Sequence, residues 1–251
     1  MADRQADGSD MGGVACAPKI RDGLHAYVAG VRDLLGEGLV GVYLYGSVAS
    51  GCSNRQTSDV DVLVVVTRAL TQAEKEALLA VHRSVPAPID ATYITREQLN
   101  RDCFPTPLQC VIRPVKLFSV PDGLVDFPVI RQDVYVNGVR LLGPEVRELV
   151  RPVPWEVLDP CVRQLFPVAL ERFKNPVLML CRICCTLTTR RPCSKADAGR
   201  WALTVAPPQW QDLIRQALDD YARGVRQRDL DEDQARAFEQ WCRRQAAGDA
   251  G

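Results

Sequence analysis

The pattern of apolar and polar positions divides the chain into a first half with strands and a second half of helices. In residues 20–35 apolar side chains recur every three or four positions, which predicts an amphipathic helix. The apolar run 42–45 and the valine-rich run 59–66 predict two strands, with a glycine turn and a polar loop between them. A third strand is predicted at 89–94, after a helix at 71–83. Up to about residue 100, strands and connecting helices are therefore expected.

Capping residues indicate where several of these helices begin. Thr71 followed by Glu74 has the sequence of a capping box, and His82, near the end of the same helix, is interpreted as an ordinary helix-end residue. Ser194 and Asp197 repeat the capping sequence in the second half, where helical patterns continue. The helices expected there are 175–188, 194–205, one from 207 to beyond 221, and 231–244.

The order of these elements predicts an α+β protein. All four tryptophans lie in the last hundred residues and the valine-rich strands before them, so we expect an N-terminal mixed sheet with flanking helices followed by a C-terminal α-helical bundle. We place a disordered tail at 1–17, the sheet domain at 18–150 and the helical domain at 151–251. Residues 101–123 predict only an extended connection or a hairpin, and 126–142 fit either a strand or a helix.

Charge and cysteine content narrow the classes of function. Lysine plus arginine equals aspartate plus glutamate, at 31 each, so there is no basic field and we do not expect a nucleic acid partner. The ten cysteines lack regular spacing, and the acidic N-terminal residues do not form a secretory segment, so we expect reduced thiols and a cytoplasmic protein. No run of eighteen apolar residues predicts a membrane span, and we expect a monomer.

Two carboxylates mark the second predicted strand as a candidate site. Side chains on a strand alternate between its faces, so Asp59 and Asp61 point the same way, about 7 Å apart. Carboxylate oxygens at this spacing suit Mg²⁺. By itself the Asp-Val-Asp sequence also fits an ordinary solvated strand end.

The residues before this strand favour the site. Gly46-Ser47, eleven further residues and Asp59-Val60-Asp61 resemble the signature of the polymerase-β-like nucleotidyltransferases. The resemblance implies that the Gly-Ser turn contacts a nucleoside triphosphate and that the aspartates hold the metal ions that bridge its phosphates. Such a site still requires a base for the attacking hydroxyl, and Asp90 in the third strand is the candidate. Without the signature, Asp90 would be interpreted as a solvated edge-strand residue.

A lysine in the second half stands at an electrostatically unusual position. Lys195 directly follows the capping residue Ser194, where the helix dipole disfavours a cation. An anion bound at the helix start, such as a triphosphate, would reverse the sign of this interaction. Alternatively, the long side chain bends into water at little cost.

Longer segments resemble a particular family, the aminoglycoside adenylyltransferases of the streptomycin and spectinomycin type. The resemblance extends from Val42 to about Tyr221 and is carried by the segments YLYGSVASG, SDVDVLVVV, PIDATYI, LLGP and NPVLMLCRICCTLTTRRPCSKADAGRWAL. It implies ATP as co-substrate and two Mg²⁺ ions. It also implies that Gly46, Ser47 and Ser58 contact the phosphates, that Asp59 and Asp61 bind the metal ions, and that Asp90 is the general base. Lys195 and Tyr221 would make further contacts to ATP, and Asp126 is a weaker candidate on the nucleotide side.

The chain also departs from this family at positions that concern the acceptor. It has Asp90 where members often have glutamate, and after Leu108-Gln109 it continues with residues 110–113 where members have a tryptophan in the substrate cleft. Before the NPVLMLCR segment, streptomycin-modifying members have an acidic residue, whereas residues 171–174 here are Glu-Arg-Phe-Lys and include two cations. Spectinomycin is therefore favoured over streptomycin.

We expect transfer of AMP from ATP to a hydroxyl of an aminoglycoside or aminocyclitol, with release of pyrophosphate. Two alternatives stay open. One is a nucleotidyltransferase that acts on a protein or RNA acceptor. The other is a non-catalytic, antitoxin-like nucleotide-binding module, for which intact Asp59, Asp61 and Asp90 would have no purpose.

Overall fold

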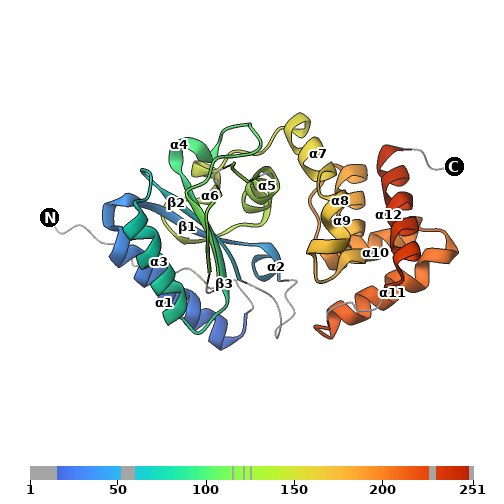
Figure 1. The fold of residues 1–251 in the computed structure, drawn as a ribbon, viewed down its shortest axis with the longest axis horizontal. Helices are drawn as coiled ribbons and strands as arrows, with labels where there is room; N and C mark the ends of the chain where they lie inside the picture. Colours follow the sequence, from blue (N-terminus) through green and yellow to red (C-terminus); the bar gives the residue numbers. More distant parts are fainter. Residues whose placement is uncertain are drawn as a thin grey trace. The chain divides into compact units, whose positions relative to one another are not determined.

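The structure, a computed structural model, describes residues 16–51, 60–114, 116–120, 122–124, 126–225 and 230–248. The chain divides into two compact units, residues 1–152 and 153–251 (Figure 1). The first holds a sheet with flanking helices and the second is helical, which confirms the predicted α+β class.

The described strands of the first unit form one six-stranded mixed sheet. The strands are β1 (Leu39–Tyr45), β2 (Val60–Val66), β3 (Ile89–Thr95), β4 (Cys110–Arg113), β5 (Lys116–Phe118) and β6 (Val139–Leu142). Their order is β5-β4-β3-β2-β1-β6. Only β2 and β3 among them pair in parallel, and helix α3 (Gln72–Ser84) makes the crossover that a parallel pair needs.

Helices cover both faces of this sheet, so the alternation of side chains gives two separate apolar cores. One face packs against α1 (Pro18–Leu35) and α3, and its core includes Val60, Val62 and Val64 of β2. The other face packs against three shorter helices and includes Leu63 and Val65 (Figure 1). These are α4 (Arg96–Leu99), α5 (Phe127–Asn137) and α6 (Val146–Leu149).

The structure resolves the two segments that the sequence left open. Residues 101–123 contain the hairpin of β4 and β5, one of the two forms expected. Residues 126–142 are divided between a helix and a strand, α5 and β6, and Gly138 between them lets the chain turn, because an added Cβ there would lie 2.3 Å from the Val134 carbonyl oxygen.

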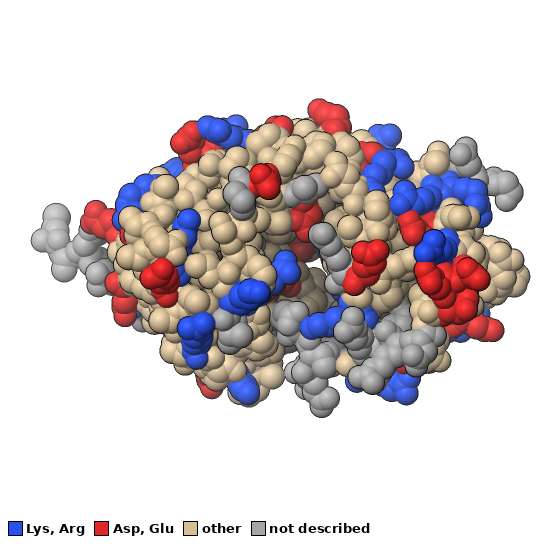
Figure 2. All heavy atoms as spheres, in the orientation of Figure 1, with Lys and Arg blue, Asp and Glu red and all other residues tan. Residues whose placement is uncertain are grey.

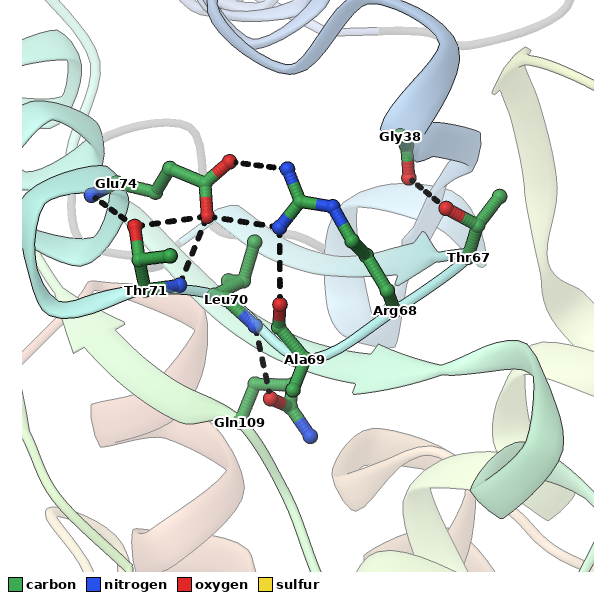
Figure 3. A network of polar contacts seen from close by, with 8 residues as sticks. All are labelled: Gly38, Thr67, Arg68, Ala69, Leu70, Thr71, Glu74 and Gln109. Carbon is green, nitrogen blue, oxygen red and sulfur yellow. Dashed lines mark hydrogen bonds and ion pairs between the residues drawn. The ribbon is translucent and has the colours of Figure 1, made fainter.

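The start of α3 is held by the predicted capping box and by a basic neighbour (Figure 3). The Glu74 amide donates to Thr71 Oγ1 over 3.2 Å, and the Glu74 carboxylate accepts from the Thr71 amide over 2.8 Å. Arg68 binds the same carboxylate over 2.7 Å, and this bond, with the Thr71 amide, lowers the pKa of Glu74 to about 2. The Leu70 amide donates to Gln109 and so connects this loop to the segment that leads into β4.

His82 lies in the core, so its interpretation as an ordinary helix-end residue is wrong. Its Nδ1 atom is 3.2 Å from the Ile89 carbonyl oxygen, to which it must donate, which leaves Nε2 to accept from the Tyr93 hydroxyl over 3.0 Å. Tyr93 in turn bonds the Tyr27 hydroxyl over 2.7 Å. Burial lowers the pKa of His82 to about 4, so this sealed trio is neutral near pH 7. Leu78, four residues earlier, is the other buried residue of α3, so His82 lies on the inner face of this helix, which its polar character did not indicate.

The second unit is built around one buried helix, α9 (Pro176–Thr189). Its neighbours are α7 (Trp155–Arg163), α8 (Phe166–Arg172), α10 (Lys195–Val205), α11 (Pro208–Ala222) and α12 (Glu232–Ala247). The cysteines Cys181, Cys184 and Cys185 of α9 are buried among apolar side chains, and the described cysteines are free. At the start of α10, Ser194 Oγ accepts from the Asp197 amide over 3.1 Å.

Acidic and basic side chains both occur on the displayed face, in small groups of either sign, and neither sign dominates it, in keeping with the equal totals (Figure 2). In the part of the chain that the structure describes, no helix has the length and apolar character needed to cross a membrane.

Candidate functional site

Polar side chains form a row across three strands at one end of the sheet. Tyr45 of β1 lies opposite Asp61 of β2, and Asp61 lies in register with Asp90 of β3. All three belong to the face that packs against α5, since Leu63, Val65 and Ile94 of the same alternation lie in that core. On the other face at this level, Val60 and Ile89 are fully buried, whereas Asp61 and Asp90 keep part of their surface in water. The register therefore brings two of the predicted carboxylates together.

Gly46 follows β1 directly and closes tightly over Asp61. Its φ is +72°, a left-handed conformation that strains other residues. A Cβ atom at this position would lie 2.3 Å from Asp61 Oδ2, so no larger residue fits without displacing the carboxylate. Helix α2 (Gly46–Ala49) carries Ser47 next to it, and the Ser50 hydroxyl donates to the Gly46 carbonyl oxygen over 3.0 Å.

A buried carboxylate that sequence reasoning missed holds this turn. The Gly46 amide donates to Asp133 Oδ2 over 3.1 Å, and Asn137 donates to Asp133 Oδ1 over 2.8 Å. This amide, predicted as a phosphate contact, is therefore already engaged. The sequence offered no signal for Asp133, because residues 126–142 fitted a strand as well as a helix. It was therefore undefined which of their side chains face the sheet.

The pKa of Tyr45 is affected by the negative charges at this end of the sheet. Burial raises the pKa of the Tyr45 hydroxyl well above its ordinary value. The charges of Asp61, Asp90 and Asp126 act in the same direction, and a hydrogen bond with Thr92 opposes them. Asp126, at the start of α5, is thus electrostatically part of the same group.

Arg113, at the end of β4, extends the row by one strand. Its Nε atom lies 3.3 Å from Asp90 Oδ2, and its guanidinium carbon is 5.7 Å from the centroid of the Phe118 ring in β5. Its position was missed because residues 101–123 gave no strand register.

The remaining predicted residues lie elsewhere or outside the described residues. In the second unit, Lys195 is the first residue of α10, and its Nζ atom lies 5.9 Å from the centroid of the Phe173 ring. Tyr221 lies in the last turn of α11. Ser58 and Asp59 lie outside the described residues.

The donor atoms at the sheet end suit a hard divalent cation. Among the described residues no three His, Cys, Asp or Glu side chains are arranged to hold a metal ion. Asp61 and Asp90 nevertheless offer carboxylate oxygens on one face, which are the ligands that Mg²⁺ prefers.

Comparison with known families divides the chain in the same way as its fold. Residues 28–110, which contain Gly46, Asp61 and Asp90, match the nucleotidyltransferase domain family. Residues 149–245, which contain Lys195 and Tyr221, match the family described as aminoglycoside adenylyltransferase, C-terminal domain.

Individual relatives extend over most of both units. A spectinomycin 9-adenylyltransferase of Staphylococcus aureus is 28% identical over 211 residues, which are 76% of this chain and 81% of the relative. An aminoglycoside (3'') (9) adenylyltransferase of Klebsiella pneumoniae is 24% identical over 229 residues, 82% of this chain and 87% of the relative. A crystal structure of spectinomycin adenyltransferase AAD(9) from Enterococcus faecalis with ATP and spectinomycin has the same fold, with a TM-score of 0.75 at 18% identity over 90% of this chain and 99% of that one.

Proposed function

We propose that the chain is an aminoglycoside adenylyltransferase that transfers AMP from ATP to a hydroxyl group of spectinomycin or a closely similar aminocyclitol. In the reaction the acceptor oxygen forms a bond to the α-phosphorus of ATP, and the bond from that phosphorus to the β-phosphate oxygen breaks. The products are the adenylylated acceptor and pyrophosphate, and the acceptor proton passes to a base.

One observation carries this proposal: Asp61 and Asp90 lie in register on the same face, beside a glycine turn at which an added Cβ atom would displace the Asp61 carboxylate. Asp90 takes the proton of the acceptor hydroxyl, and the Gly46–Ser47 turn orients the triphosphate. Because the Gly46 amide is bonded to Asp133, the phosphate contact of this turn is assigned to Ser47. The buried Asp133 carboxylate holds the turn by accepting a hydrogen bond from the Gly46 amide.

A metal requirement follows from the donor set. Asp61, with Asp59 outside the described residues, would hold Mg²⁺, which supplies positive charge to the phosphates when it is bound. Two ions are proposed, as the family resemblance implies. Asp90 is kept for the proton, because a base must have an oxygen available to the attacking hydroxyl.

Lys195 of the helical unit is proposed as a further nucleotide contact, as the family resemblance implies. Lys195 follows the capping residue of α10, so its ammonium and the helix start both favour a bound phosphate. The cation–π contact of its ammonium with the Phe173 ring supports an oriented rather than a freely moving side chain. Tyr221 and Asp126 are assigned to ATP from the resemblance alone. The cytoplasmic location and monomeric state predicted from the sequence also stay predictions.

The proposal is tested by incubating the protein with ATP labelled at the α-phosphate, Mg²⁺ and either spectinomycin or streptomycin. We expect label on spectinomycin with an equal amount of pyrophosphate, and no labelled product after EDTA is added. The Asp61→Asn variant, prepared in parallel, controls for a contaminating enzyme. The proposal of a small-molecule acceptor is overturned if label appears only on protein or RNA, or if no labelled product forms with any acceptor.

A further inference from the structure

The surroundings of Asp90 are asymmetric in charge. Toward β2 its neighbour is another carboxylate, Asp61. Toward β4 its partner is the guanidinium of Arg113, and Lys116 of β5 pairs with Arg113 in the ladder. Both cations lie against the ring of Phe118, at 5.7 Å for Arg113 and 5.1 Å for Lys116. One side of the carboxylate is therefore acidic and the other is basic and aromatic.

The geometry also indicates which ligand each side meets. The residues assigned to phosphate and metal, Ser47 and Asp61, lie in α2, directly after β1, and in β2, on the acidic side of Asp90. In an in-line displacement the attacking oxygen enters opposite the leaving oxygen, so the acceptor approaches from the side away from these residues. That side is the edge formed by β4 and β5. Arg113 thus lies beside the proposed base, on the side from which the acceptor would approach.

We propose that Arg113 positions the Asp90 carboxylate and sets the charge preference of the acceptor site, so that hydroxyl compounds with few positive charges are used and those with several guanidinium groups are rejected. The inference rests on the proposed function, because it takes Asp90 as the base. It names a residue of this chain as the cause of a preference for spectinomycin over streptomycin.

Two physical effects combine in this assignment. An arginine on a strand, held by an aromatic ring, fixes the carboxylate orientation better than water would, because a guanidinium donates in a fixed plane. The same positive charge repels a cationic acceptor at short range, while the side chain stays 60% exposed and leaves the core untouched. Substitution should therefore alter catalysis and selectivity without unfolding the unit.

The test compares Arg113→Gln and Arg113→Lys with a matched control, Arg140→Gln. Arg140 lies on β6, the opposite edge of the same sheet, and also forms an exposed ion pair, with Glu145 over 3.1 Å. For each protein we would measure kcat and KM for spectinomycin, KM for ATP, and the inhibition constant of streptomycin against spectinomycin. Calorimetric titration with each compound gives binding without turnover.

For Arg113→Gln we expect kcat for spectinomycin to fall about three- to tenfold and streptomycin to bind about three- to tenfold more tightly, with KM for ATP unchanged. Arg113→Lys keeps the charge, so it should keep the rejection of streptomycin while recovering only part of kcat. Arg140→Gln should behave as the wild type.

The inference is overturned if Arg113→Gln binds streptomycin no better than the wild type does, or if Arg140→Gln changes selectivity equally. A wild type that binds both compounds but transfers no AMP would instead remove the proposed function. In that case the binding titrations still decide whether Arg113 discriminates by charge.

Discussion

The two faces of strands β1 to β3 differ in how completely they are closed. Toward α1 and α3 the side chains are apolar and buried, and the polar atoms of Tyr27, Tyr93 and His82 bond one another. Toward α5, Asp61 and Asp90 stand at the starts of β2 and β3 and stay partly exposed. Since alternate residues of one strand supply both faces, one short sequence encodes a sealed core and a reactive edge.

This contrast separates stability from chemistry. Removing the partner of a buried polar group lowers the free energy of unfolding, whereas removing a charged group from an exposed position changes that free energy little. Substitutions on the sealed face should therefore change unfolding, and substitutions on the open face should change turnover. Four predictions test this division, from the largest expected effect to the smallest.

The largest effect is expected for Asp61→Asn. The amide has the size of the carboxylate but no charge, so adenylyl transfer should fall by a factor on the order of 10³ or more, while the melting temperature stays close to that of the wild type. Labelled product formation and circular dichroism measure the two quantities. Asp33→Asn on the exposed surface of α1 is the matched control. Near-normal turnover of Asp61→Asn would contradict the assignment of the open face.

Gly46→Ala should have the next largest effect. A methyl group meets Asp61 Oδ2 at 2.3 Å, and φ is left-handed, so we expect a loss of roughly 10²-fold in turnover and about 1 kcal/mol in stability. Gly36→Ala is the control, because Gly36 also has positive φ but nothing within 4 Å of an added Cβ. The control should lose similar stability and keep its activity. Equal turnover of the two variants would show that the contact with Asp61 is unimportant.

On the sealed face, His82→Gln should lower the free energy of unfolding by about 1–3 kcal/mol at pH 7.5 and leave kcat unchanged. The pKa of His82 is lowered to about 4 in the folded protein, so the wild type keeps the full contribution above pH 6.5 and loses it as the pH falls through 4. The variant lacks this group, so urea unfolding at several pH values should show a flatter curve between pH 6.5 and 4. The exposed His25→Gln is the control. A curve for His82→Gln as steep as that of the wild type would argue against a buried neutral histidine.

The smallest effect is expected at the cap of α3. Glu74→Gln should cost about 1 kcal/mol at neutral pH, because the bond to the Thr71 amide and the pair with Arg68 are weakened. The pKa of Glu74 is lowered to about 2, so the contribution is present above pH 4.5 and disappears as the pH falls toward 2. Unfolding of Glu74→Gln and of the exposed Glu76→Gln, measured at pH 7 and pH 2.5, should differ more at the higher pH than at the lower. A constant difference would mean that the cap does not depend on the charge.

Much of this division could be predicted from local patterns. The strand at Val60–Val66, the capping box at Thr71 and helix α9 follow from a valine-rich run, from a Thr-Glu spacing of three and from helical spacing of apolar positions, which depend only on neighbours in the chain. The contacts of His82, Arg113 and Asp133 could not be predicted in this way. Each depends on a partner at another place in the chain, and two of them lie in segments whose register the sequence left open.

The sequence by itself determined which local features are present: a glycine turn, two strands with carboxylates, and a serine-capped helix whose first residue is a lysine. Side-chain alternation also fixed that Asp61 and the valines beside it point to opposite faces. Only the tertiary structure decided which strand is next to which. The parallel register sets Asp61 beside Asp90, the antiparallel hairpin gives Asp90 an arginine, and α5 brings Asp133 to the Gly46 amide. These contacts join residues far apart in the chain, so they follow from packing of the whole unit and not from any local rule.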